Sequence, residues 1–386
     1  MSNHCLDTGL RARPYRDDNL PFPKFEKPNP IGYFSVSTER NYEPTARNLR
    51  YFKQPKNFPL DLNKGLSLAI KKPESAYDER LDHVLQFICD HKEQLLNQQE
   101  QTLSSKPSIN AEFICWRGLL RLLMSTPYEF QQDWCIHVTK YMGSFYLCKR
   151  DSEYDKFQRD NETQDCKNMS AWGFKFEQYC LSESPFIEPD TSAPVDECSE
   201  FSCVFKTKLN GMDILYGAEM DGIISEQPVQ DEKNDLKLSD LKFVELKTSQ
   251  GDLNPRQQQS YNRFKTRNWW CQSFLVGIQD LYVGLRTDKG LVKKIEHLEV
   301  RSLPKLGVNY WTPTACANFL IQFFSTLREV MANENCPYTT YEFYFNSSTS
   351  RVTYECIKGK TEHSFLPDWY IGMFQLSTSR TSPKEN

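Results

Sequence analysis

The sequence predicts one large mixed α/β domain. Its 386 residues exceed an average domain, and 39% hydrophobic with 13% aromatic residues provide enough apolar surface for a substantial core. Helical patterns are frequent from Glu79 to Cys180, and short β-rich runs take over from Phe201. No linker and no repeat of about 20–50 residues divides the chain, so we assign residues 1–375 to one domain.

The first part of the chain is expected to be extended. Residues 11–60 contain eight prolines, which is too many for long helices, so this segment is predicted to lie over a core. Ten cations against five anions between Arg11 and Lys56 give this segment a charge of +5. The charge indicates either a positive surface or a solvated, proline-broken arm.

Helices and one strand are predicted next. Apolar positions in Glu79–Leu96 fall largely on one helical stripe, and a second helix is predicted near Arg117. Ser144–Cys148 is typical of a strand, and Ala171–Cys180 of a helix. The acidic, proline-containing loop from Ser182 to Glu200 is expected to be mobile.

Strands follow from Phe201. The runs are Ser202–Lys206, Ile214–Ile224 and Leu241–Thr248, and a polar insertion, Ser225–Asp240, separates the last two, which are expected to pair antiparallel.

The last part of the chain returns to helices. Asn254 is a good N-cap residue and Pro255 follows it at the first helical position, so a helix is predicted from Pro255 to about Val276. Strands are predicted at Leu281–Arg286 and Lys293–Leu298, and a helix at Ala315–Met331. Residues 376–386 are expected to be a disordered tail.

Composition excludes several classes of protein. No apolar run approaches the roughly 18 residues that a membrane span needs, and the mean hydropathy is −0.65. The first ten residues show no secretory signal, so a reducing compartment is expected. The thirteen cysteines, which include no CxxC pair, are therefore predicted to be buried thiols, and structural zinc is not expected. A net charge of −4 excludes nucleic-acid binding by overall charge, although a local basic groove stays open.

Two predicted strands carry acidic residues inside apolar runs. Strand periodicity places Glu219 and Asp221 on one face, about 7 Å apart, and does the same for Glu245 and Lys247. If the strands pair, three carboxylates and one ammonium group line one pocket. Clustered carboxylates raise one another's pKa, so a divalent cation is the usual way to stabilise them, and oxygen ligands favour Mg²⁺ or Mn²⁺. This pattern predicts a metal-dependent nuclease, although cross-strand salt bridges on a solvated sheet face remain the alternative.

Further motifs occur in order along most of the chain. They are Gly32-Tyr33-Phe34-Ser35 with Arg40-Asn41-Tyr42 and Leu49-Arg50-Tyr51, Glu79-Arg80-Leu81-Asp82-His83, Cys115-Trp116-Arg117-Gly118 with Thr126-Pro127-Tyr128-Glu129, Gly173-Phe174-Lys175-Phe176-Glu177, Glu219-Met220-Asp221, Glu245-Leu246-Lys247-Thr248-Ser249 and Trp269-Trp270-Cys271-Gln272-Ser273-Phe274. Together they resemble the decapping exoribonucleases called DXO. The resemblance implies two twisted mixed β-sheets flanked by helices, related to the PD-(D/E)XK nucleases, and two Mg²⁺ or Mn²⁺ ions.

The resemblance also implies roles for individual residues. The metal ligands would be Glu177, Glu219, Asp221, Glu245 and the backbone carbonyl of Leu246. Lys247 and Gln272 would orient water or the scissile phosphate, with Glu219 also near the substrate. Contacts to the first RNA nucleotides or the cap would come from Arg40, Glu79, Trp116, Arg117 and Gly118. Many members carry a substrate-contacting cysteine where this chain has Ser202, with Cys203 beside it.

Some of these residues have an ordinary structural alternative. Glu177 could be a surface glutamate, and Arg117 could pair with Glu112 or Glu129. The tryptophans Trp269 and Trp270 are expected to pack in the core rather than stack on bases.

The predicted helix after Pro255 carries a further pattern. Arg256, Ser260, Arg263 and Arg267 would form a basic stripe suited to an RNA backbone. Lys265, Trp269 and Gln272 would share another face, directed toward the metal pocket.

The resemblance implies an activity on RNA 5′ ends. Family members remove incomplete guanosine caps, NAD and related nucleotide-metabolite caps, and 5′ triphosphates, and many then degrade the RNA from its 5′ end. The alternatives are an RNA-end-binding adaptor that stabilises a separate 5′–3′ exonuclease, and a DNA endonuclease of the broader PD-(D/E)XK group. A monomer is favoured, and nuclear residence is implied by the family alone, with cytoplasmic residence also open.

Overall fold

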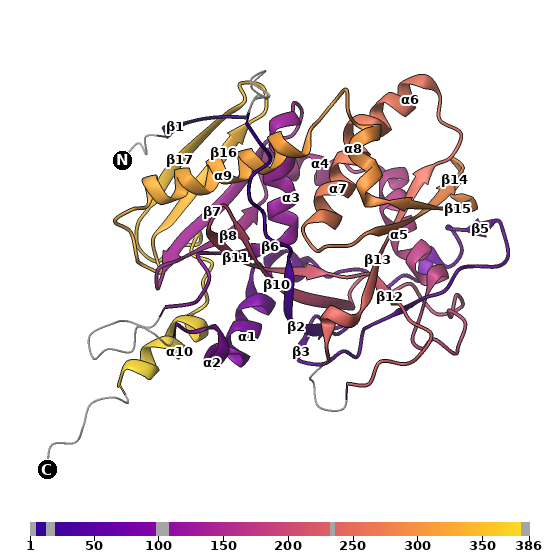
Figure 1. The fold of residues 1–386 in the computed structure, drawn as a ribbon, viewed down its shortest axis with the longest axis horizontal. Helices are drawn as coiled ribbons and strands as arrows, with labels where there is room; N and C mark the ends of the chain where they lie inside the picture. Colours follow the sequence, from indigo (N-terminus) through magenta and orange to yellow (C-terminus); the bar gives the residue numbers. More distant parts are fainter. Residues whose placement is uncertain (1–4, 13–19, 98–107, 232–235, 380–386) are drawn as a thin grey trace, which may run out of the picture.

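The computed structural model describes residues 5–12, 20–97, 108–231 and 236–379, which form two β-sheets with flanking helices (Figure 1). The strands are β1 (Leu6–Arg11), β2 (Asn29–Val36), β3 (Tyr42–Glu43), β4 (Tyr51–Phe52), β5 (Leu60–Asp61), β6 (Phe113–Trp116), β7 (Trp134–Tyr141), β8 (Ser144–Arg150), β9 (Leu181–Ser182), β10 (Glu200–Leu209), β11 (Met212–Glu219), β12 (Gly222–Ile224), β13 (Lys242–Gln250), β14 (Asp280–Arg286), β15 (Leu291–Glu299), β16 (Thr340–Asn346) and β17 (Arg351–Ile357). The α-helices are α1 (Asp82–Asp90), α2 (Lys92–Leu95), α3 (Arg117–Ser125), α4 (Glu153–Asp160), α5 (Gln164–Cys180), α6 (Pro255–Ser260), α7 (Thr266–Phe274), α8 (Leu303–Leu306), α9 (Pro313–Val330) and α10 (Asp368–Ser379). Short 3₁₀ turns are η1 (Leu66–Leu68), η2 (Glu74–Asp78), η4 (Thr126–Tyr128), η5 (Leu238–Asp240) and η7 (Val300–Ser302), and η6 (Tyr261–Lys265) is a π-helical turn.

Both sheets are mixed, which confirms the predicted fold class. The ten-stranded sheet has the order β1-β17-β16-β7-β8-β6-β11-β10-β2-β3, and its parallel pairs are β11 with β6 and β6 with β8. The seven-stranded sheet has the order β5-β15-β14-β13-β12-β4-β9, and its parallel pairs are β13 with β14 and β12 with β4.

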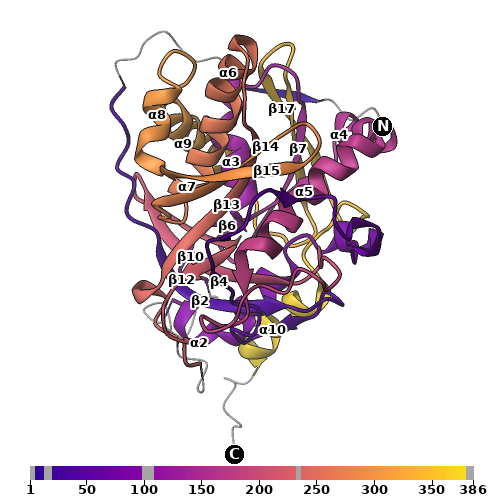
Figure 2. The ribbon, with the colours of Figure 1, turned by 90° about the vertical axis from the view of Figure 1, so that its right-hand side faces the viewer.

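Helices cover both faces of both sheets. On the ten-stranded sheet, α3 and α9 pack on one face, while α1 and α10 pack on the other. On the seven-stranded sheet, α7 and α8 lie opposite α5 (Figure 2). One apolar cluster contains Trp134 and Phe113 of the first sheet together with Leu281 and Val283 of the second. A core shared by the two sheets supports our proposal that residues 1–375 form one domain.

The proline-rich N-terminal segment is extended, as predicted. Residues 20–60 contain strands and no helix, and these strands add to both sheets: β2 pairs with β10, whereas β4 pairs with β12 and β5 with β15. Residues 13–19 of this predicted segment lie outside the described residues.

Several predicted helices have different limits. The predicted helix Glu79–Leu96 is divided at His91, which closes α1 and has non-helical dihedral angles of −108° and 21°. The predicted C-terminal tail begins too early, because α10 continues through Ser379; residues 380–386 lie outside the described part of the chain.

The helix after Pro255 begins as predicted but does not carry the predicted basic stripe. Asn254 and Gln257 form a capping box at its start, and the π-helical turn η6 then interrupts the 3.6-residue period. Arg267 is consequently buried, donates to the carbonyl of Tyr128 at 3.3 Å, and does not face solvent. Trp269 and Trp270 pack in the core, which confirms that prediction.

Eight of the thirteen cysteines are buried, while Cys5 and Cys166 are exposed, so the prediction of buried thiols is wrong for these two. No helix in the described part of the chain is both long and apolar enough to cross a membrane.

Candidate active site

Glu219 and Asp221 lie where the chain passes from the ten-stranded sheet to the seven-stranded sheet. The predicted single strand Ile214–Ile224 is in fact β11 followed by β12. The amide of Met220 still donates to Phe201 of the first sheet at 2.9 Å, and the amide of Ile223 donates to Arg50 beside the second sheet, also at 2.9 Å. The two acids are therefore not alternate residues of one pleated strand, and the change of direction brings Asp221 beside β13.

Asp221 occupies a free edge of β13. Antiparallel pairing between β12 and β13 ends at Gly222 and Val244, so the amides that follow on β13 have no β12 partner. The Asp221 carboxylate accepts a hydrogen bond from the amide of Leu246 at 2.6 Å. Because the amide and carbonyl of a strand residue point to the same side, the Leu246 carbonyl also points toward this edge.

Glu245 is the fully buried acid of the group. Its carboxylate accepts hydrogen bonds from Gln272 Nε2 at 2.6 Å, from Lys247 Nζ and from Arg117 at 3.4 Å. Burial alone would raise the pKa of Glu245, but the charges of Lys247 and Arg117 outweigh burial and lower it. The alternative partners that we considered for Arg117 are wrong, since Glu112 pairs with Arg328 and Glu129 accepts from backbone amides.

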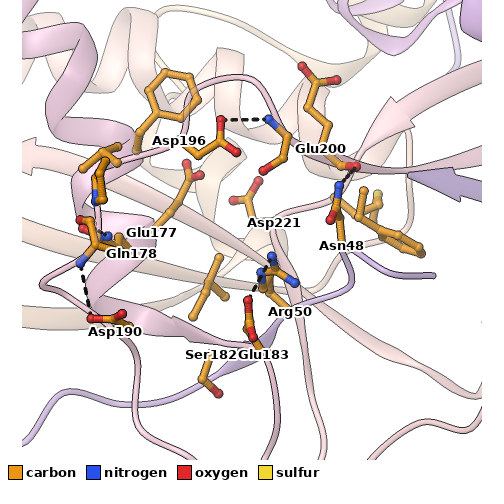
Figure 3. A pocket seen from close by; sticks show the side chains of 18 of the residues that line it. Asn48, Arg50, Glu177, Gln178, Ser182, Glu183, Asp190, Asp196, Glu200 and Asp221 are labelled. Carbon is orange, nitrogen blue, oxygen red and sulfur yellow. Dashed lines mark hydrogen bonds and ion pairs between the residues drawn. The ribbon is translucent and has the colours of Figure 1, made fainter. Parts of the chain in front are cut away.

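Glu177 reaches the same place from another layer. It is a half-buried residue of α5, which packs against β13. Its carboxylate and that of Asp221 point into one cavity (Figure 3). Burial, followed by the charges of Asp221 and Glu219, raises the pKa of Glu177 well above its ordinary value.

The site contains more negative charge than its own cations neutralise. Burial raises the pKa of Asp221 to about 6. Glu219 is open to the water of the cleft on one side but enclosed by protein on the others, and burial together with Glu200 raises its pKa to about 8. Lys247 remains charged, because Glu245 and Asp221 outweigh its burial and raise its pKa. A set of oxygen donors with unmet negative charge fits a hard divalent cation.

Two cavities meet at Glu219. The smaller, of about 350 Å³, is lined by Glu177, Glu219 and Asp221. The larger, of about 740 Å³, is lined by most of the predicted substrate contacts, which are Arg40, Glu79, Trp116, Arg117, Gly118, Glu219 and Gln272. Gly217 permits close packing beside the larger cavity, because an added Cβ there would lie 2.7 Å from the Trp116 ring. The structure thus brings the predicted metal ligands and the predicted substrate contacts to adjoining spaces.

Arg40 is held by other residues of the larger cavity. Its guanidinium makes ion pairs with Glu79 at 2.6 Å and with Glu200 at 2.8 Å. Lys72 also pairs with Glu200, at 2.5 Å. The predicted contacts Arg40 and Glu79 therefore contact each other, and two residues that sequence reasoning missed, Lys72 and Glu200, join them.

Ser202 is not brought to either cavity. It is fully buried in β10 between β2 and β11, and its hydroxyl has no hydrogen-bond partner among the described residues. Strand alternation places Glu200 on the same face as Ser202. Knowledge of the register of β10 against β11 would therefore have identified Glu200 as a residue of the site. That register is not visible in the sequence.

The chain belongs to the RAI1-like PD-(D/E)XK nuclease family, whose model matches residues 26–371. It is 36% identical over 354 residues to the decapping and exoribonuclease protein Rai1 of Drosophila melanogaster, with 91% of this chain and 92% of that protein covered. Membership confirms the resemblance to decapping nucleases and the assignment of the chain as a hydrolase.

Two solved structures share the fold. Rai1 of Candida albicans in complex with pU5 and Mn²⁺ superposes with a TM-score of 0.76 at 18% identity, covering 97% of this chain and 100% of that one. Rai1 of Scheffersomyces stipitis in complex with 3′-NADP⁺ and calcium superposes with a TM-score of 0.74 at 19% identity, covering 92% and 98%. At these identities the likeness is evidence for the fold.

Proposed function

We propose that this protein is a metal-dependent RNA 5′-end decapping nuclease that removes non-canonical caps, incomplete guanosine caps or 5′ triphosphates. The observation that carries the proposal is the excess of carboxylates at the junction of the two sheets: the pKa values of Glu177, Glu219 and Asp221 are all raised, beside the charged Lys247. This arrangement is costly unless cations occupy it. The calcium and Mn²⁺ ions in the complexes of the related Rai1 proteins agree with this choice of cofactor.

The proposed ligands are Glu177, Glu219, Asp221, Glu245 and the carbonyl of Leu246, holding two Mg²⁺ or Mn²⁺ ions. When bound, such ions lower the pKa of a water molecule and offset the charge of a phosphoryl group. Lys247 and Gln272 both contact Glu245, so they keep this carboxylate oriented and place donors beside the reacting phosphate. Arg117 lies at the boundary of the larger cavity, where its guanidinium can pair with a phosphate.

The larger cavity is the proposed place for the RNA 5′ end. Attack at the first RNA phosphodiester would release an intact nucleotide cap or a triphosphorylated nucleotide, whereas release of pyrophosphate requires cleavage within the triphosphate chain. We propose NAD-type caps among the substrates, and the 3′-NADP⁺ complex of a relative supports this choice. We further propose 5′–3′ degradation after decapping, nuclear residence, a monomeric state and a 5′–3′ exoribonuclease as a partner.

The test is a panel of RNAs that differ only at the 5′ end. NAD-capped, unmethylated-guanosine-capped, triphosphate and monophosphate RNA are incubated with Mg²⁺ or Mn²⁺, with an EDTA control. The proposal expects metal-dependent release of at least one cap or triphosphate product, and no product in EDTA. Separation of nucleotide products distinguishes decapping from exonuclease cleavage.

Two variants and one further substrate distinguish the rival functions. Glu219→Ala and Asp221→Ala should abolish cleavage, and Asp252→Ala, which changes a carboxylate with a 98% exposed side chain, should not. An adaptor would bind the RNA ends and give no metal-dependent product even in the wild type. Cleavage of circular DNA would instead indicate an endonuclease, because an enzyme that needs a free 5′ end leaves circles intact.

A further inference from the structure

A second group of metal-ligating side chains lies on the ten-stranded sheet, away from the carboxylates of the candidate active site. Cys135 and His137 are alternate residues of β7, so they share a face, and Glu342 of β16 is directly opposite His137. One ligand atom from each of these three residues lies within 4.8 Å of the others. Strand β7 is separated from β11, which ends at Glu219, by β8 and β6 (Figure 1).

A fourth ligating group adjoins these three. His363, in the segment between β17 and α10, places Nδ1 at 3.9 Å from Glu342 Oε2, and its ring centroid is 5.3 Å from that of His137. Glu342 and His363 are partly exposed, whereas Cys135 and His137 are buried. The group therefore has a buried floor and a side open to solvent, through which an ion could enter.

His137 provides an independent indication of a missing ligand. Its side chain is 2% exposed, and Nε2 bonds to Glu342 Oε2 at 2.8 Å. The other ring nitrogen, Nδ1, is buried and has no hydrogen-bond partner among the described residues. Buried polar atoms are normally satisfied, so an orphaned imidazole nitrogen next to a thiol and a carboxylate calls for an explanation.

We propose that Cys135, His137, Glu342 and His363 form a second metal site, for Zn²⁺ or a transition ion of similar chemistry. A thiolate, two imidazoles and one carboxylate are ligands that zinc accepts and that Mg²⁺ does not favour. Tetrahedral zinc with bonds of about 2.0–2.3 Å places its ligand atoms roughly 3.3–3.8 Å apart. Glu342 Oε2 lies 2.8 Å from His137 Nε2 and 3.9 Å from His363 Nδ1, and these two separations bracket that range.

The charges of the site are consistent with a divalent cation. Cysteine binds a metal ion as the thiolate, so the thiol proton of Cys135 must leave when the ion binds. One thiolate and one carboxylate then balance the two positive charges. Arg150 lies opposite Cys135 on β8 and is the nearby charge that opposes a cation.

A metal here would fasten the segment between β17 and α10 to the sheet. That segment accepts a hydrogen bond from Arg80 at the carbonyl of Ser364, at 2.8 Å, and Arg80 lines the larger cavity. The proposed role is therefore structural. The sequence does not reveal the site, because its ligands come from β7, β16 and a later loop, and no local spacing links them.

The test is a cobalt titration of the full-length protein, followed by displacement with zinc. Cobalt bound to a thiolate absorbs strongly in the near ultraviolet through charge transfer, whereas cobalt on the oxygen ligands of the active site does not. We expect one equivalent of cobalt to produce this band in the wild type and in Cys166→Ser, which removes an exposed thiol. The band should be absent in Cys135→Ser. Binding of cobalt should release about one proton from the Cys135 thiol, and zinc should then displace the cobalt without further proton release.

A second variant keeps the proposal falsifiable if Cys135→Ser does not fold. Glu342→Gln changes a partly exposed residue and retains an oxygen for its hydrogen bonds, and the affinity for cobalt should fall at least about tenfold. The proposal is overturned by absence of the band in the wild type, by a band that persists in Cys135→Ser, or by unchanged affinity in Glu342→Gln. These residues would then form a hydrogen-bonded contact without metal.

Discussion

Replacement of Asp221 by Asn should stabilise the metal-free protein. An aspartate in an unfolded chain has a pKa of about 3.9, whereas burial, followed by the charge of Glu245, raises the pKa of Asp221 in the folded protein to about 6. Each pKa unit corresponds to about 1.4 kcal/mol, so ionised Asp221 costs the metal-free fold up to about 3 kcal/mol. Asparagine removes this cost and retains an oxygen that can accept from the amide of Leu246.

The pH dependence gives the sign of the effect. The folded protein holds this proton more tightly than the unfolded chain, so the cost is absent below about pH 4, grows as the pH rises, and is complete above about pH 6. Urea denaturation in EDTA should show Asp221→Asn to be more stable than wild type by about 2–3 kcal/mol at pH 8, with the difference falling below about 1 kcal/mol at pH 4.

Metal and a matched control complete this experiment. With Mn²⁺ at about 100 times its dissociation constant, the wild type should gain about 2.7 kcal/mol, and the variant, which lacks one proposed ligand, should gain less. Asp252→Asn, at a highly exposed carboxylate, should change stability little in either condition. Equal or lower stability of Asp221→Asn in EDTA at pH 8 would refute the reasoning.

Three further changes test the supports of the site. Gly284→Ala should destabilise the fold by about 1–3 kcal/mol and weaken Mn²⁺ binding, because the new Cβ would lie 2.6 Å from the Phe176 ring beside Glu177; calorimetry should show no such loss in Gly173→Ala, where the same helix has open space. Arg117→Gln should raise the pKa of Glu245, because one of the two cations that lower this pKa is lost. In Mn²⁺ titrations at several pH values, the variant should then need a higher pH than the wild type to reach the same affinity. An unchanged pH profile would show that Arg117 does not affect the pKa of Glu245. Asn254→Ala should lower stability by about 1 kcal/mol through loss of the capping box, as measured by thermal denaturation, and unchanged stability would show that the cap contributes little.

Elements with strong local signals could be predicted from the sequence. The strands Leu281–Arg286 and Lys293–Leu298 fall within β14 and β15, because short β-rich runs lie between polar turns. The helix after Asn254 begins where predicted, because its cap is a local hydrogen-bond pattern. The strand pattern alone proposed Glu219, Asp221 and Glu245 as a carboxylate cluster, whereas Glu177 was proposed only through the ordered motifs, since composition alone favoured a surface role for it.

Features set by long-range pairing could not be predicted. The run Ile214–Ile224 is apolar apart from Glu219 and Asp221, and nothing local reveals that it leaves one sheet for the other at Met220. The π-helical turn contains about one residue more than an α-helical turn, so the residues after it are rotated about the helix axis and Arg267 lies in the core. Ion pairs such as Lys72 with Glu200 join residues that are distant in sequence, so they depend on a register that only the folded chain provides.

The charge of the two cavities is consistent with the proposed direction of RNA binding. The larger cavity is lined by six Lys and Arg residues against four acids, whereas the smaller is lined by one arginine against eight acids. A phosphate backbone is therefore attracted to the larger cavity and repelled from the smaller, and Glu219 lies at the boundary between them. Cations held at this boundary would attract the phosphate that reaches it, while the acids beyond oppose further entry. This asymmetry explains how a protein of net charge −4 could accept an RNA end, and it favours cleavage close to a terminus over cleavage within a continuous strand.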